Sequence, residues 1–308
     1  VIININKKMY YLYLLLLIFV ILILMKAYVK IKYKFWAYQP VFHYYNIFYW
    51  IYPPGIINTL LPDVNKFCNF YNNHTCIYEN TDKKSLETII DFLKIHYLQN
   101  NRASYLPTLS SFQNHFIGNN NKSFISTYYK TTKKQSDKNF INKINNGINS
   151  GINSGINSGI NSGINSGINN ENISTSELIG VMTTRPLNIT IGDKPTFKLY
   201  YVDHLCIHKD HRKEGIAQEI IQTHEYIQRH NNKNVQVSLF KREGELTGIV
   251  ALTIYNTYLF TINNIDKQSL PHASMTLIEI NKQNITLFMT LIYNVKSKFK
   301  CIILPDYS

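Results

Sequence analysis

The middle of the chain carries a strand, a basic turn and a helix in direct succession. An apolar run with high β-propensity spans 199–207 and is bounded by polar residues. Residues 208–214 follow as a charged turn, and Gly215 has no side chain where a ligand could approach the backbone. Residues 214–230 then place apolar side chains at helical spacing, so that one face can pack on a sheet. This order predicts a strand–turn–helix unit of an α/β protein.

The same unit offers a site for an anion. A helix that begins after a basic loop presents unpaired backbone N–H groups and the positive end of its dipole. Arg212 and Lys213 add positive charge in that turn. Residues 212–217 resemble the pyrophosphate loop of the GCN5-related (GNAT) acyltransferases, although an ordinary strand-to-helix connection with surface charges has the same pattern.

Three further segments resemble one family of that superfamily, the glycylpeptide N-myristoyltransferases. Residues 35–41 are similar to the Phe-Trp-x-x-Gln-Pro-Val segment near the start of the family's catalytic domain. Residues 177–185 resemble the strand before its catalytic strand, and 203–209 resemble its Asn-Phe-Leu-Cys-Val-His-Lys strand. The segments stand in the family's order, and the resemblance covers about 34–260 apart from one insertion.

The resemblance implies a GNAT-like mixed twisted α/β sheet with flanking helices, with myristoyl-CoA as acyl donor, an N-terminal glycine peptide as acceptor and no metal. Backbone N–H groups at His204 and Leu205 correspond to the family's oxyanion hole, where no particular side chain is needed. The residues expected to bind CoA are Phe35, Trp36, Gln39, Arg212, Lys213, Glu214, Gly215, Ile216 and Ala217.

The sequence also departs from the family. His204 replaces a phenylalanine, and Glu214 reverses a charge in the phosphate loop. The family has two tandem halves and uses its C-terminal carboxylate as general base, so this base is expected to be missing from a chain that ends at Ser308 after one half. Asp203 is the nearest acidic candidate. Two alternatives stay open: a single-domain GNAT N-acetyltransferase, and a non-catalytic membrane-tethered acyl-CoA-binding protein.

An uninterrupted apolar run at 9–25 is near the length of a membrane-spanning helix. We expect a transmembrane signal anchor over 9–28; a buried core helix and a cleaved signal peptide are the alternatives, but no Ala-x-Ala-like site follows. More lysines follow the run than precede it, which predicts a single-pass membrane protein whose folded domain faces the cytoplasm. A glycosylated Asn73 would instead place the domain outside the cytosol.

A Gly-Ile-Asn-Ser repeat of period four fills 147–167. One isoleucine in four residues buries too little surface to offset the entropy of ordering, so 130–175 is predicted to be a disordered insertion in a hairpin loop. A short-period solenoid is the structured alternative. The insertion separates the N-terminal part of the domain, 30–129, from its acyl-CoA-binding core, 176–262, and 263–308 forms a partial C-terminal region.

Further elements are expected from the pattern alone. The sequence predicts an amphipathic helix at 81–99 and a short helix within 105–116. The expected strands besides the central one are 123–129, 177–184, 235–240, 248–260, 274–280 and 300–304.

Charge and cysteine content limit the other function classes. The net charge of +13 favours anionic partners, but no dense basic stripe interleaved with aromatic residues suggests a nucleic-acid partner. Four scattered cysteines fit neither a disulfide framework nor a zinc site. Cys206 is expected to be a small buried hydrophobe of the central strand rather than a nucleophile.

Overall fold

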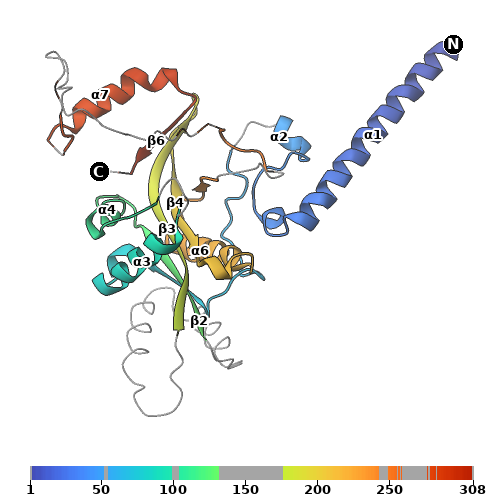
Figure 1. The fold of residues 1–308 in the computed structure, drawn as a ribbon. Coiled ribbons are helices and arrows are strands. Elements are labelled where there is room, and N and C mark those ends of the chain that lie inside the picture. The colour runs from blue at the N-terminus through green and yellow to red at the C-terminus, as the bar shows by residue number, and fades with distance from the viewer. Residues whose placement is uncertain are drawn as a thin grey trace.

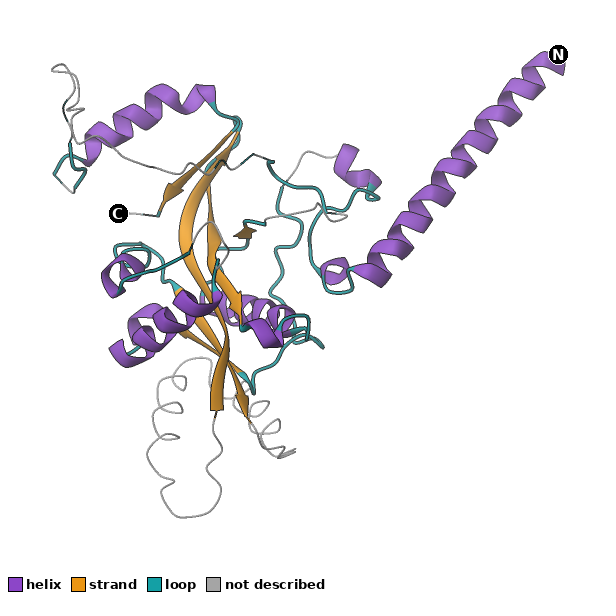
Figure 2. Cartoon of the chain, viewed as in Figure 1, coloured by secondary structure: helices purple, strands orange, loops and turns teal. Residues whose placement is uncertain are grey.

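The computed structural model describes residues 2–51, 55–98, 104–131, 176–242, 249–254, 256, 258, 276, 278–281 and 283–306. Its centre is a twisted, mostly antiparallel sheet in the order β1-β2-β3-β4-β5, with β6 added on β3 (Figures 1 and 2). The strands are β1 (Asn73–Ile77), β2 (Phe124–Thr131), β3 (Ser176–Ile191), β4 (Phe197–Ile207), β5 (Ser238–Phe240) and β6 (Cys301–Pro305).

Among the described strands, only the β4–β5 pair is parallel. A parallel neighbour needs a crossover connection, and helix α6 (Ile216–Asn231) supplies it. The α/β class and the GNAT-like sheet with flanking helices agree with the expectation from the sequence.

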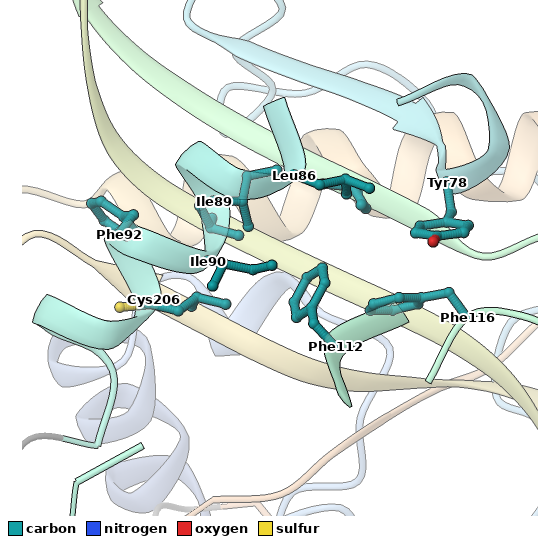
Figure 3. Close-up of a cluster of buried hydrophobic side chains, with 11 residues drawn as sticks. Tyr78, Leu86, Ile89, Ile90, Phe92, Phe112, Phe116 and Cys206 are labelled. Carbon is teal, nitrogen blue, oxygen red and sulfur yellow. The ribbon is translucent and has the colours of Figure 1, made fainter. Parts of the chain in front are cut away.

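Helices cover both faces of this sheet. On one face, α3 (Lys83–His96) and α4 (Leu109–Gln113) bury side chains against Val181 and Cys206 of the sheet (Figure 3). On the other face, α6 packs against Met182 and Val202. Because successive residues of a strand point to opposite faces, neighbours such as Val181 and Met182 enter different cores.

Gly180 of β3 allows α6 to approach the sheet closely. A Cβ atom at this position would lie 2.6 Å from Cδ1 of Ile220 and 3.2 Å from Cβ of Tyr128. Such distances are shorter than ordinary van der Waals contact, so any larger residue must displace its neighbours. The glycine therefore sets the depth at which α6 sits.

The N-terminal helix α1 (Ile2–Lys32) extends away from the sheet (Figure 1). Within its segment Lys8–Lys32, an 18-residue window has a mean hydropathy of 2.7, and 6% of that window is buried. The helix is long and apolar enough to cross a membrane. A 3₁₀ turn at Trp36–Tyr38 and the short helix α2 (Ile47–Ile51) follow it.

Several expected elements have different limits in the structure. The helix predicted from 214 begins at Ile216, because Gly215 takes the left-handed conformation with φ of 88° and ends the turn. The strand expected at 235–240 is confined to Ser238–Phe240. Within 249–254 there is only an isolated bridge at Ile249, and the described part of 274–280 contains no strand.

Besides the short helix α2, two elements were not expected. Strand β1 pairs with β2, and helix α7 (Ile285–Val295) precedes β6 together with a 3₁₀ turn at Lys296–Lys298. The repeat insertion at 132–175, whose disorder was predicted, lies outside the described residues.

Candidate functional site

A β-bulge marks the C-terminal half of β4. Thr183 of β3 pairs with His204, and the next residue, Thr184, pairs with Val202, so Asp203 is the extra residue. Two side chains hold it: Tyr97 Oη donates to the Asp203 carbonyl oxygen at 3.1 Å, and Arg185 Nε donates to Asp203 Oδ2 at 2.8 Å. The bulge is therefore fixed from α3 and from β3.

The bulge changes which backbone groups face the edge of β4. Before it, the Tyr200 N–H donates toward β5, to the Val237 carbonyl; after it, the His208 N–H donates toward β3, to the Ile179 carbonyl. Since N–H directions alternate along a strand, the N–H groups of Leu205 and Ile207 are assigned to the edge away from β3. Strand β5 pairs only with Tyr200–Val202, so among the described residues no strand covers this edge beyond the bulge.

A pocket of about 710 Å³ opens beside this edge. Three segments border it: the C-terminal end of α3 (96–98), β4 at 205–207, and the turn with the start of α6 (211–218). The strand, basic turn and helix that are consecutive in sequence thus form most of its wall. The contribution of α3 was not expected, since a helix terminus carries no motif that associates it with a turn more than 100 residues later.

The turn is shaped to direct backbone N–H groups at the pocket. Lys213 and Gly215 both have positive φ, of 70° and 88°. Within the described part of the chain, no N–H of 213–217 donates to a backbone carbonyl. Unpaired N–H groups at the start of a helix, together with its dipole, bind phosphate groups well.

Arg212 fixes the turn to its surroundings. Its Nη2 donates to the His96 carbonyl at 3.0 Å, and its Nε donates to the Ile207 carbonyl at 3.3 Å. These bonds connect the turn to the end of α3 and to the end of β4. Arg212 therefore holds the pocket wall as well as contributing positive charge.

His204 lies in the core with both ring nitrogens bonded. Its Nε2 is 2.9 Å from Tyr105 Oη and its Nδ1 is 2.8 Å from Thr183 Oγ1. Burial, with smaller effects of His115 and Arg185, lowers the pKa of His204 to about 3, so the imidazole is neutral near pH 7. The side chain is a structural part of the bulge. The alternation that starts from His208 directs the His204 N–H toward β3, so its role as an oxyanion donor stays a prediction from the resemblance.

Cys206 points into the α3 core, as Figure 3 shows. Burial raises the pKa of its thiol to about 12, which keeps the sulfur protonated and unreactive. This agrees with the expectation of a small buried hydrophobe.

The three N-terminal residues expected to bind CoA lie elsewhere. Phe35 is 1% exposed in the α6 core, and Trp36 packs edge-on against Phe240 with ring centroids 6.0 Å apart. Gln39 Nε2 donates to Gln222 Oε1 of α6 at 2.8 Å. None of the three borders the pocket. Their role in binding CoA stays a prediction.

The carboxylates near the pocket are already paired. Glu214 lies 3.2 Å from His211 Nδ1, and Asp203 is paired with Arg185. Burial raises the pKa of Asp203, and Arg185 opposes this effect. Neither carboxylate is an unengaged general base in this arrangement.

Comparisons with known proteins give matches at the level of structure only. No protein-family model matches the sequence, and no curated protein matches it either. Crystal structures of Saccharomyces cerevisiae N-myristoyltransferase with bound myristoyl-CoA are similar at TM-scores of 0.50 and 0.51, both with 15% identity, over 90% and 89% of this chain. A third, with bound myristoyl-CoA and inhibitors, has a TM-score of 0.50 and 13% identity over 92% of the chain.

The matches cover 60%, 57% and 61% of those yeast chains, so this chain spans about three fifths of their length. The chain therefore has an N-myristoyltransferase-like fold of the GNAT type.

Proposed function

We propose that this protein is an acyl-CoA-dependent N-acyltransferase that transfers a myristoyl group from myristoyl-CoA to an N-terminal glycine. The observation that carries the proposal is the uncovered edge of β4 beside a pocket closed by a basic turn and a helix N-terminus. A thioester placed along the edge meets backbone N–H groups, while its phosphates meet the turn. The solved structures with this fold were determined with myristoyl-CoA bound.

The proposed reaction needs no cofactor besides the acyl donor. The neutral amine of the peptide attacks the thioester carbonyl, a C–N bond forms, and the C–S bond breaks to release the CoA thiolate. Backbone N–H groups stabilise the oxyanion of the tetrahedral intermediate: the Leu205 N–H, which is assigned to the open edge of β4, and the His204 N–H, whose role rests on the resemblance alone. A carboxylate or water removes one proton from the peptide's ammonium group before the attack, and the CoA thiolate takes up the proton that the nitrogen loses when the amide forms.

CoA is proposed to bind across the turn. The N–H groups of 213–217 receive a phosphate, and Arg212 and Lys213 supply countercharge. Contact of Phe35, Trp36 and Gln39 with the donor is proposed from the resemblance alone, since none of the three borders the pocket.

Helix α1 is proposed to anchor the protein through residues 9–28, with the folded domain on the cytoplasmic side. The length and hydropathy of the helix support a span, and the lysines that follow it support this orientation. An acyl-CoA donor would be available on that side, so the orientation is consistent with the proposed donor.

Acyl-CoA binding without transfer is the second candidate. It is favoured by the pairing of Glu214 with His211 and of Asp203 with Arg185, which engages the carboxylates near the pocket. Such a protein would hold or present the acyl donor rather than react with it.

The test uses the full chain in lipid nanodiscs, with empty nanodiscs as the control for partitioning of the donor. Binding of myristoyl-CoA, acetyl-CoA and CoA is measured by calorimetry, and transfer is measured by mass spectrometry of a peptide with N-terminal glycine against one with N-terminal alanine. We expect preference for myristoyl-CoA and acylation of the glycine peptide only. Preference for acetyl-CoA would overturn the proposal, and tight myristoyl-CoA binding without acylation would select the second candidate.

A further inference from the structure

Helix α7 is unusually apolar for an exposed helix. None of its residues is fully buried. A stripe of four residues at helical spacing is half-buried, and a polar stripe lies on the opposite side at spacings of four: Thr286, Thr290 and Asn294. Leu287 and Leu291, one turn apart beside the half-buried stripe, are 53% and 56% exposed.

A basic segment follows the helix immediately. Lys296 and Lys298 lie in the 3₁₀ turn after α7, Lys300 lies just beyond, and all three are exposed. The described part of α7 contains no acidic residue. An apolar flank next to clustered lysines is the combination that binds the boundary between acyl chains and anionic headgroups.

The length of α7 decides between crossing a membrane and lying on it. Its 11 residues span about 16 Å, whereas a bilayer core is about 30 Å thick. A polar stripe along the whole helix also disfavours crossing. The helix is therefore suited to lie in the plane of the interface.

The position of α7 fits a membrane held by α1. Figure 1 shows α7 and α1 at the same end of the long strands β3 and β4, away from the end that leads into 132–175. Helices α3 and α6 flank the other part of the sheet. One membrane surface can thus meet both helices while the pocket side of the sheet stays in water.

We propose that α7 and Lys296, Lys298 and Lys300 form a second membrane contact, with the Leu287–Leu291 flank among the acyl chains and the lysines at anionic headgroups. The inference rests on the proposed anchoring by α1. With this second contact, the folded domain lies against the membrane surface instead of being attached to it through α1 alone.

The test measures the depth of α7 in nanodiscs of phosphatidylcholine, with and without phosphatidylserine, using acyl-brominated lipid as a quencher. Leu291→Trp in the full chain reports on the apolar flank, and Thr286→Trp is the matched control on the polar stripe. The native Trp36 and Trp50 contribute the same background to both variants. Leu287→Trp repeats the measurement on the same flank if Leu291→Trp does not fold.

We expect the added emission of Leu291→Trp to be quenched in anionic discs about twofold or more beyond that of Thr286→Trp. Replacing the three lysines by glutamine should remove this difference. Equal quenching at the two positions, including the case in which a second copy of the chain covers α7, overturns the proposal. Quenching that survives the lysine replacements overturns their assigned role.

A separate measurement distinguishes loss of the α1 anchor from loss of the α7 contact. A chain that does not co-elute with discs of phosphatidylcholine alone lacks the α1 anchor. A chain that co-elutes while Leu291→Trp stays unquenched in anionic discs has the anchor but not the second contact.

Discussion

At the scale of single residues, Arg212 both carries positive charge beside the pocket and holds the pocket wall together. Its side chain is predicted to contribute positive charge to a phosphate site, and the structure adds two bonds to carbonyl oxygens of α3 and β4. The charge of Arg212 could be predicted from the sequence because Arg212 belongs to the segment 212–217 that resembles the pyrophosphate loop. The bond to His96 depends on a contact between residues 116 positions apart, which no local pattern contains.

Arg212→Ala should weaken CoA binding about tenfold, because the change removes a charge and releases the turn from the pocket wall. Lys209→Ala is the matched control: it removes the same charge from the same turn, but Lys209 does not border the pocket. Calorimetry with CoA measures both variants. Equal weakening in the two would show that only net charge matters.

Two buried histidines should make the fold sensitive to acid. Burial lowers the pKa of His204 to about 3 and that of His224 to about 4, from an ordinary value of 6.5. Between the ordinary pKa of 6.5 and the lowered pKa of each histidine, the unfolded chain binds protons that the folded chain does not. The free energy of unfolding should therefore be highest above pH 6.5 and fall toward pH 4, by up to about 1.4 kcal/mol per pH unit for each histidine.

Urea unfolding at a series of pH values measures this effect. His204→Phe removes one of the two groups and restores the residue of the resembled family, so it should flatten the decline without abolishing it. A slope unchanged by this substitution would show that His204 is not neutral in the folded protein.

At the scale of elements, Gly180 and Ile220 determine how α6 packs on β3. Gly180→Ala should destabilise the fold by about 1–3 kcal/mol, because its Cβ meets Ile220 Cδ1. Ile220→Val removes that atom and alone should cost about 0.5–1.5 kcal/mol. The double variant should cost clearly less than the sum, as measured by urea unfolding. Additive costs would contradict the assigned contact.

The same packing shows which elements the sequence can predict. Helices α3 and α6 have strong periodicity because one face of each is buried in a core, and their existence was predicted. Strands β3 and β4 were predicted from their apolar, β-prone residues, and β3 is buried on both faces. Strand β1 (NHTCI) has no such apolar run and forms by pairing with β2. Helix α7 was not predicted, although its polar residues Thr286, Thr290 and Asn294 recur at helical spacing.

At the scale of the whole molecule, the insertion joins two strands that are already paired. Thr131 and Ser176 are partners at the end of the β2–β3 ladder, so a short hairpin turn can connect them. Replacing 133–174 by a tight turn should keep the fold and CoA binding. It should raise the free energy of unfolding by about 2 kcal/mol, because the loop to be closed becomes about tenfold shorter.

Thermal unfolding and calorimetry check this prediction on the full chain and the shortened one. A chain of equal length with the repeat scrambled is the matched control, and it should behave as the native chain does. Lost CoA binding in the shortened chain would mean that the insertion takes part in the site.

The sequence by itself determined the strand–turn–helix unit, the apolar N-terminal helix and the resemblance to the N-myristoyltransferases. These depend on local order: periodicity, charge and glycine placement act between residues close in the chain. Only the tertiary structure decided that β4 bulges at Asp203, that β5 stops at its pairing with Val202, and that α3 closes the pocket. Those features arise from contacts between segments that are distant in the chain. The free energies of this pairing and packing cannot be read from a local sequence pattern.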